Sequence, residues 1–277
     1  MNPARGRLWA TVVWVVMGFF LLNVAGLIGQ VVVNSVGTRW FATWLPQGWT
    51  LHWYGDAWDD FALGDVLIVT AEVVGAVVLI SALVGVPAAY VLARRDFGLK
   101  RAVLLLFLLP LLVPPITYGI PLATVLYRVG LGGTLWGVIL ANLVPSVPFV
   151  VLTMTPFVEQ LDPRVEAAAR VFGANTVQLF ARVLVPLLAP GILAACLLVL
   201  VRTIGMFELT FLTSGADSQT LVVALYYAVF APGVRATQSV DAMAVIYTLS
   251  TLFWLVVAMR FIDPTQIVGR AKRQAAH

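Results

Sequence analysis

Long apolar runs alternate with short polar stretches along most of the chain, which is the pattern of a protein whose helices cross a bilayer. A helix needs about 20 mainly apolar residues to cross the hydrocarbon core. Six runs reach that length, and they cover residues 9–33, 63–93, 102–127, 135–157, 187–212 and 240–262. The sequence therefore predicts an all-α integral membrane protein with six transmembrane helices, of which the last five form a core over residues 63–262.

Three other features of the pattern are ambiguous. The run at 9–33 follows Arg5 and Arg7 as a secretory signal would, but it is too long and has no clear cleavage site, so we interpret it as a retained span. Residues 34–61 hold five of the nine tryptophans and are expected to form a loop on the membrane surface. Residues 218–230 are apolar but too short to cross, and fit a re-entrant or interfacial helix.

The basic residues predict an orientation, because Lys and Arg are enriched in cytoplasmic loops. With the N-terminus inside, the outer segments hold only Arg39, Arg128 and Arg235. Both termini and the segment between the fourth and fifth spans are therefore predicted to be cytoplasmic. The basic residues on that side are Arg5, Arg7, Arg94, Arg95, Lys100, Arg101, Arg164, Arg170, Arg182, Arg260, Arg270, Lys272 and Arg273.

Composition agrees with the membrane class. Of the 277 residues, 61% are hydrophobic and 11% charged, and the mean hydropathy is +0.97. A soluble domain carries about 25% charged residues. The pI near 9.5 does not indicate a nucleic-acid surface, because the 17 basic residues form no patch interleaved with aromatic residues. We expect membrane lipid, and no nucleic acid, among the partners.

Residue counts exclude most catalytic and metal sites. His52 and His277 lie near neither a cysteine nor each other, so zinc-ligand spacing is absent, and the single Cys196 forms no intrachain disulfide. Neither Lys100 nor Lys272 follows a glycine-rich phosphate loop, and no Gly-x-Ser-x-Gly motif is present. We therefore expect a protein that is not an enzyme, that binds no metal or cofactor itself, and that leaves any ATP hydrolysis to another subunit.

Residues 162–173, DPRVEAAARVFG, interrupt the apolar pattern with a short charged helix between the fourth and fifth spans. Asp162 is a good N-cap, Pro163 suits the first helical position, and Gly173 suits a left-handed exit. The sequence therefore specifies both ends of this helix.

The apolar residues of this helix, Val165, Ala169 and Phe172, predict a single stripe. Asn175 and Thr176 begin a second helix that leads into the fifth span. Two short helices around a glycine turn predict a projecting knob whose alanines allow it to enter a groove on a partner. A plain surface helix that links two spans is the alternative.

This segment resembles the EAA loop of ABC importer permeases, whose consensus is E-A-A, three residues, G, nine residues, I-x-L-P. Val183 and Val185 stand at the consensus Ile and Leu. The other features that carry the resemblance are Glu166, Ala167, Ala168, Gly173 and the V-L-V-P run that ends at Pro186.

The resemblance implies a type I ABC permease fold, a single domain over residues 1–277 in the bacterial cytoplasmic (inner) membrane. The loop 162–186 would be the coupling helix, which docks into a groove of a cytoplasmic ATPase. The implied partners are a second permease subunit in a heterodimer, two ATP-binding cassette ATPase subunits that bind ATP and Mg, and a periplasmic or lipid-anchored solute-binding protein. The residues implied in coupling are Asp162, Glu166, Ala167, Ala168, Gly173 and Pro186.

Three longer stretches resemble the spermidine/putrescine-type branch of these permeases. They are LHWYGDAW at 51–58, PSVPFVVLTMTPFVEQLDPRVEAAA at 145–169 and LYYAVFAPGVRATQSVDAMAVIYTL at 225–249. This resemblance implies a polyamine or another cationic amine as the solute. A sugar, a phosphonate or an iron chelate is the alternative.

Ionisable residues within the spans predict a translocation path, because each costs at least ~2.5 kcal/mol at the centre of the hydrocarbon. They are Glu72, Arg202, Glu208 and Asp241. Glu208 is expected to reach the central cavity, with pairing to a neighbouring helix or snorkelling as the alternative. Asp241 alternatively caps the sixth span. Arg202 lies six residues before Glu208, so the two cannot pair along one helix face.

The prolines of LLPLLVPPITYGIP predict that the third span is broken, and freed carbonyls are tolerated where they line a cavity. Tyr118 in this span is a further polar group for that cavity, as is Asn142, which precedes an expected break at PSVP in the fourth span. Packing kinks are the alternative at each position.

Two other function classes fit less well. An ion-coupled secondary transporter would be favoured by an inverted internal repeat, and none is found. An intramembrane enzyme would need paired catalytic residues within the spans, and both histidines lie outside them.

Overall fold

The structure is a computed structural model and describes residues 3–40, 45–230 and 236–260. Regular structure in these ranges is helical, with two isolated β-bridges, so the predicted all-α membrane fold is confirmed. Five of the described helices are long and apolar enough to cross a bilayer, or six if one bent pair is a single span. The chain divides into two compact units, Met1–Leu63 with Leu225–Leu249 and Gly64–Ala224 with Ser250–His277.

The first unit contains α1 (Pro3–Ser35), α2 (His52–Asp60) and the beginning of α12 (Thr237–Arg260). α1 covers the predicted first span and leaves its apolar side chains largely exposed. The prediction of a loop over residues 34–61 is wrong at α2, which is anchored because Trp53 Nε1 donates to the Gly37 carbonyl at 2.8 Å. Trp44, another tryptophan of this stretch, lies outside the described residues.

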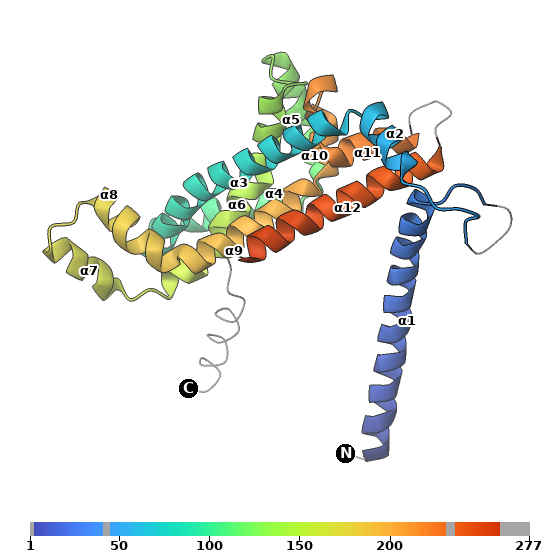
Figure 1. Cartoon of the computed structure of the whole chain (residues 1–277). Coiled ribbons are helices and arrows are strands. Elements are labelled where there is room, and N and C mark those ends of the chain that lie inside the picture. The colour runs from blue at the N-terminus through green and yellow to red at the C-terminus, as the bar shows by residue number, and fades with distance from the viewer. Residues whose placement is uncertain (1–2, 41–44, 231–235, 261–277) are drawn as a thin grey trace. The chain divides into compact units, whose positions relative to one another are not determined.

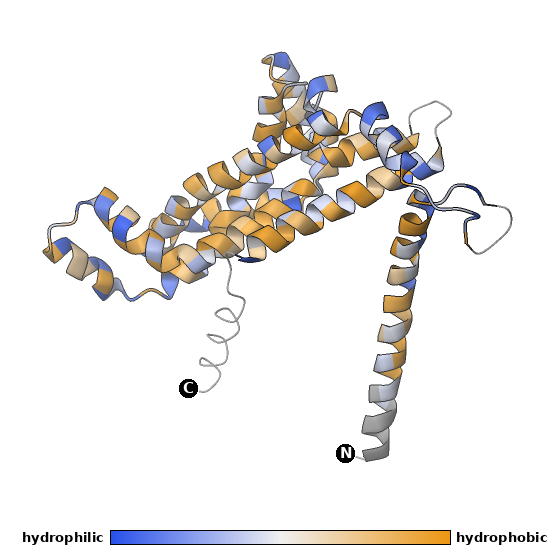
Figure 2. Cartoon of the chain, viewed as in Figure 1, coloured by the Kyte–Doolittle hydropathy of each residue, from blue (hydrophilic) through white to orange (hydrophobic). Residues whose placement is uncertain are grey.

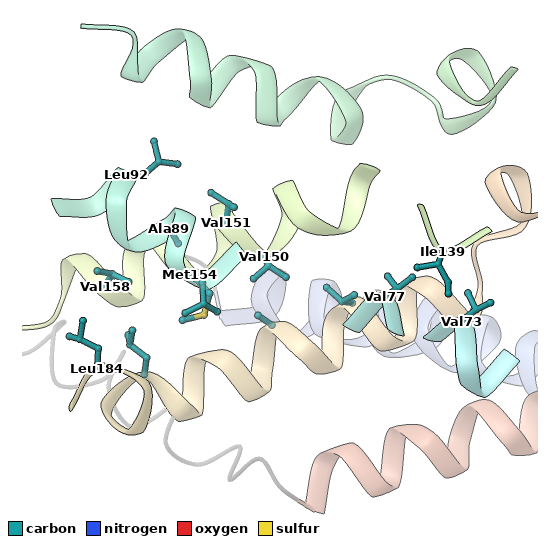
Figure 3. Close-up of a cluster of buried hydrophobic side chains, with 14 of the residues drawn as sticks. Val73, Val77, Ala89, Leu92, Ile139, Val150, Val151, Met154, Val158 and Leu184 are labelled. Atoms are coloured by element: carbon teal, nitrogen blue, oxygen red, sulfur yellow. The ribbon is translucent and has the colours of Figure 1, made fainter. Parts of the chain in front are cut away.

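The core of the second unit lies where α3 (Leu63–Arg94), α6 (Leu135–Glu159) and α9 (Val185–Ile204) pack together. Figure 3 shows valines of α3 and α6, together with Met154 of α6 and with Leu184, which directly precedes α9, in one cluster. α3 and α6 approach closely at Gly85, where an added Cβ would lie 2.7 Å from Val150 Cγ1. The absence of a side chain at Gly85 therefore sets the spacing of these two helices.

The third predicted span is broken into α4 (Lys100–Leu112) and α5 (Pro115–Arg128), which are bent by 100°. The break lies at Val113 and Pro114, whose ψ angles are both 133°. Each of these residues precedes a proline, and a following proline disfavours the helical conformation. The predicted break is confirmed, and adjacent prolines account for its position.

The predicted break at PSVP in the fourth span is wrong, because α6 runs without interruption through Pro145 and Pro148. Both prolines are buried, so packing compensates for the hydrogen bonds that they remove. The fifth span ends earlier than predicted. α9 stops at Ile204, and α10 (Phe207–Thr213) begins after a two-residue interruption that contains Gly205.

Shorter elements complete this unit: α7 (Pro163–Val171), α8 (Thr176–Leu179), the π-helix η1 (Phe180–Leu184) and the 3-10 helix η2 (Ala216–Ser218). α7 and α8 lie at one end of the unit and α5 and α10 at the other (Figure 1). Figure 2 shows polar residues on α7 and α8, while α6 and α9 are mostly apolar. The long helices α6 and α9 thus form an apolar middle section next to the polar end at α7 and α8.

Two predicted segments remain. The short apolar run at 218–230 contains α11 (Leu221–Phe230), which confirms a helix too short to cross. α12 covers most of the predicted sixth span at 240–262, whose last two residues lie outside the described part of the chain. The basic residues of the orientation argument that also lie outside it are Arg235, Arg270, Lys272 and Arg273.

The orientation can be tested with exposed positions on α2 and on the turn before α4. In a Cys196→Ala background, Asp59→Cys is expected to react with a membrane-impermeant maleimide in intact cells, and Gly98→Cys only after permeabilisation. Both positions are exposed, so access depends on the side of the membrane. The opposite labelling pattern would refute the orientation with the N-terminus inside.

Candidate coupling loop and translocation site

Local capping defines α7 as predicted. The Asp162 carboxylate accepts a hydrogen bond from the Arg164 amide at 2.9 Å, and Pro163 occupies the first helical position. Gly173 has a φ of +83°, and its amide donates to the Arg170 carbonyl at 3.0 Å. The predicted N-cap and left-handed exit are confirmed as local structure.

The second helix of the loop also begins as predicted. Asn175 and Gln178 form a capping box, with the Gln178 amide donating to Asn175 Oδ1 at 2.8 Å and the Asn175 amide donating to Gln178 Oε1 at 3.1 Å. Thr176 to Ile204 then form one helical run, with the π-helical turn just before Pro186. Pro186 cannot donate the usual backbone hydrogen bond, and the wider turn adapts the helix to this loss.

The apolar side chains at the tip of this loop point away from the protein. Val171, Phe172 and Val177 are 85%, 90% and 74% exposed. The prediction of one apolar stripe is therefore wrong at Phe172, and only Ala169 of that stripe packs against the core. The tip, defined as Val171, Phe172 and Val177, presents apolar surface without a covering element among the described residues.

Glu166 faces inward and is only 8% exposed. Tyr90 donates its hydroxyl to Glu166 Oε2 at 2.6 Å, and Arg94 Nε donates to Glu166 Oε1 at 2.7 Å. Both carboxylate oxygens are therefore occupied by side chains of α3. Ala167 and Ala168 are exposed.

Glu166 does not stand at the position of the consensus glutamate of the EAA loop. The consensus glutamate precedes its glycine by six residues, whereas Glu166 precedes Gly173 by seven. Ala167 takes the consensus acid position, and its side chain is exposed. The inward direction of Glu166 agrees with this offset of one residue, which turns a helical side chain by about 100°.

Four predicted polar residues of the translocation path gather around α10. Asn142 Nδ2 donates to Thr210 Oγ1 at 3.1 Å and to the Val138 carbonyl at 2.9 Å. Tyr118 packs beside α10, in the cluster that contains Met206 and Leu209. The Tyr118 hydroxyl is buried and has no hydrogen-bond partner among the described residues.

Arg202 and Glu208 approach this region from two different helices. The interruption at Gly205 separates the end of α9, which carries Arg202, from α10, which carries Glu208. On one continuous helix, the spacing of six residues would place Arg202 and Glu208 on different faces. Because the helix is interrupted, this spacing does not prevent the two side chains from pairing. Arg202 also lies over the Phe149 ring, 5.8 Å from its centroid, in a cation–π contact.

Two predicted path residues lie elsewhere. Glu72 is on the exposed face of α3. Asp241 belongs to the first unit, where it lies in the second turn of α12, not at its cap, and accepts a hydrogen bond from Asn34 Nδ2. Asn34 Oδ1 in turn accepts from Trp40 Nε1 at 2.8 Å. Asp241 thus joins α12 to the end of α1.

A separate pocket of about 380 Å³ lies between α3, α9 and Trp254, which belongs to α12. Its walls are apolar and include Val78, Leu200 and the sulfur-bearing Cys196. Such a lining suits hydrocarbon and not a polar solute. Among the described residues there is also no group of three or more His, Cys, Asp or Glu that could hold a metal ion.

Comparison with known proteins identifies the family. Residues 78–267 match the family described as "Binding-protein-dependent transport system inner membrane component". The chain belongs to this family. Its description is that of a membrane transport component and not of an enzyme. The resemblance to ABC importer permeases, which the loop 162–186 carries, is thereby confirmed at the level of the family.

Individual relatives agree with this permease family. The chain is 32% identical to the "Probable molybdenum ABC transporter permease protein" of Haloferax volcanii, over 64% of this chain and 71% of the relative. It is 28% identical to the trehalose transport system permease protein SugB of Mycobacterium tuberculosis, over 98% of this chain and the whole relative. These relatives do not support the spermidine/putrescine branch specifically.

The fold has a known counterpart among solved structures. A bacterial ABC transporter involved in the import of the acidic polysaccharide alginate superposes with a TM-score of 0.75 at 18% identity. The match covers 93% of this permease and 97% of that chain. At this identity the likeness establishes the fold alone.

Sequence reasoning missed Tyr90 and Arg94. Arg94 was used only in the argument for membrane orientation, and Tyr90 was not among the predicted site residues. Their contacts with Glu166 span 76 and 72 residues of chain. A local sequence pattern does not reveal contacts between residues so far apart in the chain. A buried carboxylate such as Glu166 does, however, require a hydrogen-bond donor or a positive charge beside it.

The φ of Gly173 generates a prediction about α7. Gly173→Ala is expected to destabilise the end of α7 by about 1–2 kcal/mol, because a Cβ is unfavourable in the left-handed region, although no atom lies within 4 Å of its position. Gly173→Asn should cost less, since Asn tolerates this conformation. Hydrogen exchange of the α7 amides measures the effect. Equal exchange in Gly173→Ala and the wild type would contradict it.

Proposed function

We propose that this permease couples to a cytoplasmic ATPase through the tip of its 162–186 loop and moves an uncharged sugar or a related polyol across the inner membrane. The observation that carries the proposal is the tip itself. Val171, Phe172 and Val177 are strongly exposed on a well-capped pair of short helices. A complementary groove on the ATPase would remove this apolar surface from water.

The energy of such docking comes mainly from apolar burial. Full burial of a side chain such as Phe172 contributes about 1.5–3 kcal/mol. The caps at Asp162 and Asn175 keep the two helices ordered before docking, which lowers the entropy cost of binding. ATP and Mg would be held by the ATPase, whose closure would push the loop and, with it, the attached helices.

The membrane face of α3 supports a second permease subunit as a partner. Glu72 is exposed on this apolar helix. A carboxylate in contact with lipid is unfavourable, so a water-filled path or a polar partner is expected to cover it. We propose a heterodimer with a second permease, supplied with solute by a binding protein on the outer side.

The groups around α10 favour an uncharged solute. Arg202 and Glu208 together contribute no net charge, so the region has no excess of acid for a polyamine or of base for an oxyanion. The rings of Phe207 and Phe211 stack with centroids 5.1 Å apart, and Tyr118 adds a hydroxyl. Aromatic faces together with hydroxyl and charged hydrogen-bonding groups suit a polyhydroxylated solute. The trehalose permease relative, which matches nearly the full chain, supports the same choice.

Docking can be tested by cross-linking from the tip. Phe172→Cys, in a Cys196→Ala background and labelled with a photoactivatable group, is expected to cross-link to the ATPase in the assembled transporter. Asp59→Cys, exposed on α2, is the matched control and should give no such product. Cross-linking of the Phe172 label to lipid alone would contradict the docking.

The solute can be tested by uptake into cells that express the complete transporter. Radiolabelled trehalose is expected to accumulate, and spermidine and molybdate are not. Glu208→Gln should lower trehalose uptake about tenfold, because a hydrogen bond to a charged group contributes about 1.5–3 kcal/mol. Glu159→Gln, at the exposed end of α6, is the control and should leave uptake unchanged. Uptake of spermidine, or of molybdate, in place of trehalose would refute the sugar proposal.

A further inference from the structure

The last two turns of α3 hold the coupling loop at several points. Tyr90 and Arg94 bind the two oxygens of Glu166, at 2.6 Å and 2.7 Å. Arg94 Nη2 also donates to the carbonyl of Leu161, just beyond α6, at 2.7 Å. The Tyr90 ring contacts the Phe180 ring edge-on, with centroids 5.8 Å apart. One end of α3 therefore contacts the chain before, within and after α7.

α7 has few other attachments. Of its nine residues, only Glu166 is buried and only Ala169 is half-buried, and the rest are exposed. Ala169 contributes a single methyl group to the core. The Glu166 carboxylate is thus the main side-chain attachment of α7 to the membrane helices.

We propose that Tyr90 and Arg94 are positioning residues that form a rigid latch between α3 and α7, acting through Glu166. The latch makes α3 move together with the loop when the ATPase pushes it. This inference rests on the proposed docking of the loop for its part in transport. The rigid connection of α7 to α3 stands independently of that docking.

The geometry distinguishes the latch from an ordinary surface ion pair. Exposed pairs are solvated and flexible, and most contribute little. Here the acid is buried, both of its oxygens are bonded, and the arginine is fixed by a second bond to a backbone carbonyl. A planar guanidinium that bonds two fixed acceptors at once holds both its distance and its direction. Glu166 lies one residue before the consensus acid position, which Ala167 occupies. The exposed Ala167 therefore faces outward, and Glu166 can bind Tyr90 and Arg94 inside the protein.

The rigidity can be measured without knowledge of the solute. Spin labels at Val91→Cys and Arg164→Cys, both exposed and outside the docking tip, report the separation of α3 and α7 in the assembled transporter in a Cys196→Ala background. A single narrow distance distribution, unchanged by ATP, is expected. Arg94→Ala should widen it about twofold, and Tyr90→Phe, which keeps the ring on Phe180, should widen it less.

Arg95→Ala is the matched control, because Arg95 is the adjacent exposed arginine and its loss changes the net charge equally. The distance distribution of the Arg95→Ala variant should match that of the parent double-labelled protein. Identical distributions in Arg94→Ala and Arg95→Ala would overturn the latch. So would a distance that changes with ATP in the parent double-labelled protein.

The part in transport is measured as ATP hydrolysed per trehalose taken up by proteoliposomes. Arg94→Ala is expected to assemble and hydrolyse ATP but to raise this ratio about tenfold, and Arg94→Lys to raise it less. A parallel loss of assembly, hydrolysis and uptake would indicate a merely structural residue and would overturn the proposal. Absence of the cross-link from labelled Phe172→Cys with Arg94 intact would refute the docking. A normal ratio in Arg94→Ala, with that cross-link present, would refute only the latch.

Discussion

The packing of α6 between α3 and α9 is the contact on which the rest of the transport core depends. Lipid offers no hydrophobic drive for helices to associate, so close van der Waals contact has to hold them together. Two glycines make this contact possible, since an added Cβ at Gly85 would meet Val150 at 2.7 Å and one at Gly191 would meet the Phe157 ring at 2.9 Å. A larger residue at either position would separate α6 from its neighbour along its length.

This packed trio gives the two ends of the unit a mechanical connection. At one end, α6 leads into the loop 162–186, which continues into α9, and the end of α3 holds this loop through the hydrogen bonds of Tyr90 and Arg94 to Glu166. At the other end, α5 and α10 pack against α6 and against each other, and Tyr118 packs against the cluster that contains Leu209 of α10. Closely packed helices deform little along their axes, so a displacement at the loop would be carried to the proposed solute region as a movement of whole helices.

Much of the fold could be predicted because each span is encoded locally. Hydropathy located the long helices, and adjacent prolines located the break at Val113 and Pro114. The same rule failed at Pro145 and Pro148, where burial against neighbouring helices preserved α6, and hydropathy could not reveal the interruption at Gly205, since the apolar run continues across it. At the candidate site the caps were local and were predicted. The partners of Glu166 lie 76 and 72 residues away along the chain, and no local signal encodes these contacts.

The hydrogen bond between Asn34 and Asp241 bears on how the chain is made. Trp40 lies six residues from Asn34 and is available to it almost as soon as α1 leaves the ribosome. Asp241 follows only after 207 further residues, which is about 10–40 s of synthesis at ordinary elongation rates. The first helix therefore enters the membrane early but acquires its final partner last. A chain whose synthesis ends within α11 would contain most of the transport core, while its first helix would still lack its closing contact.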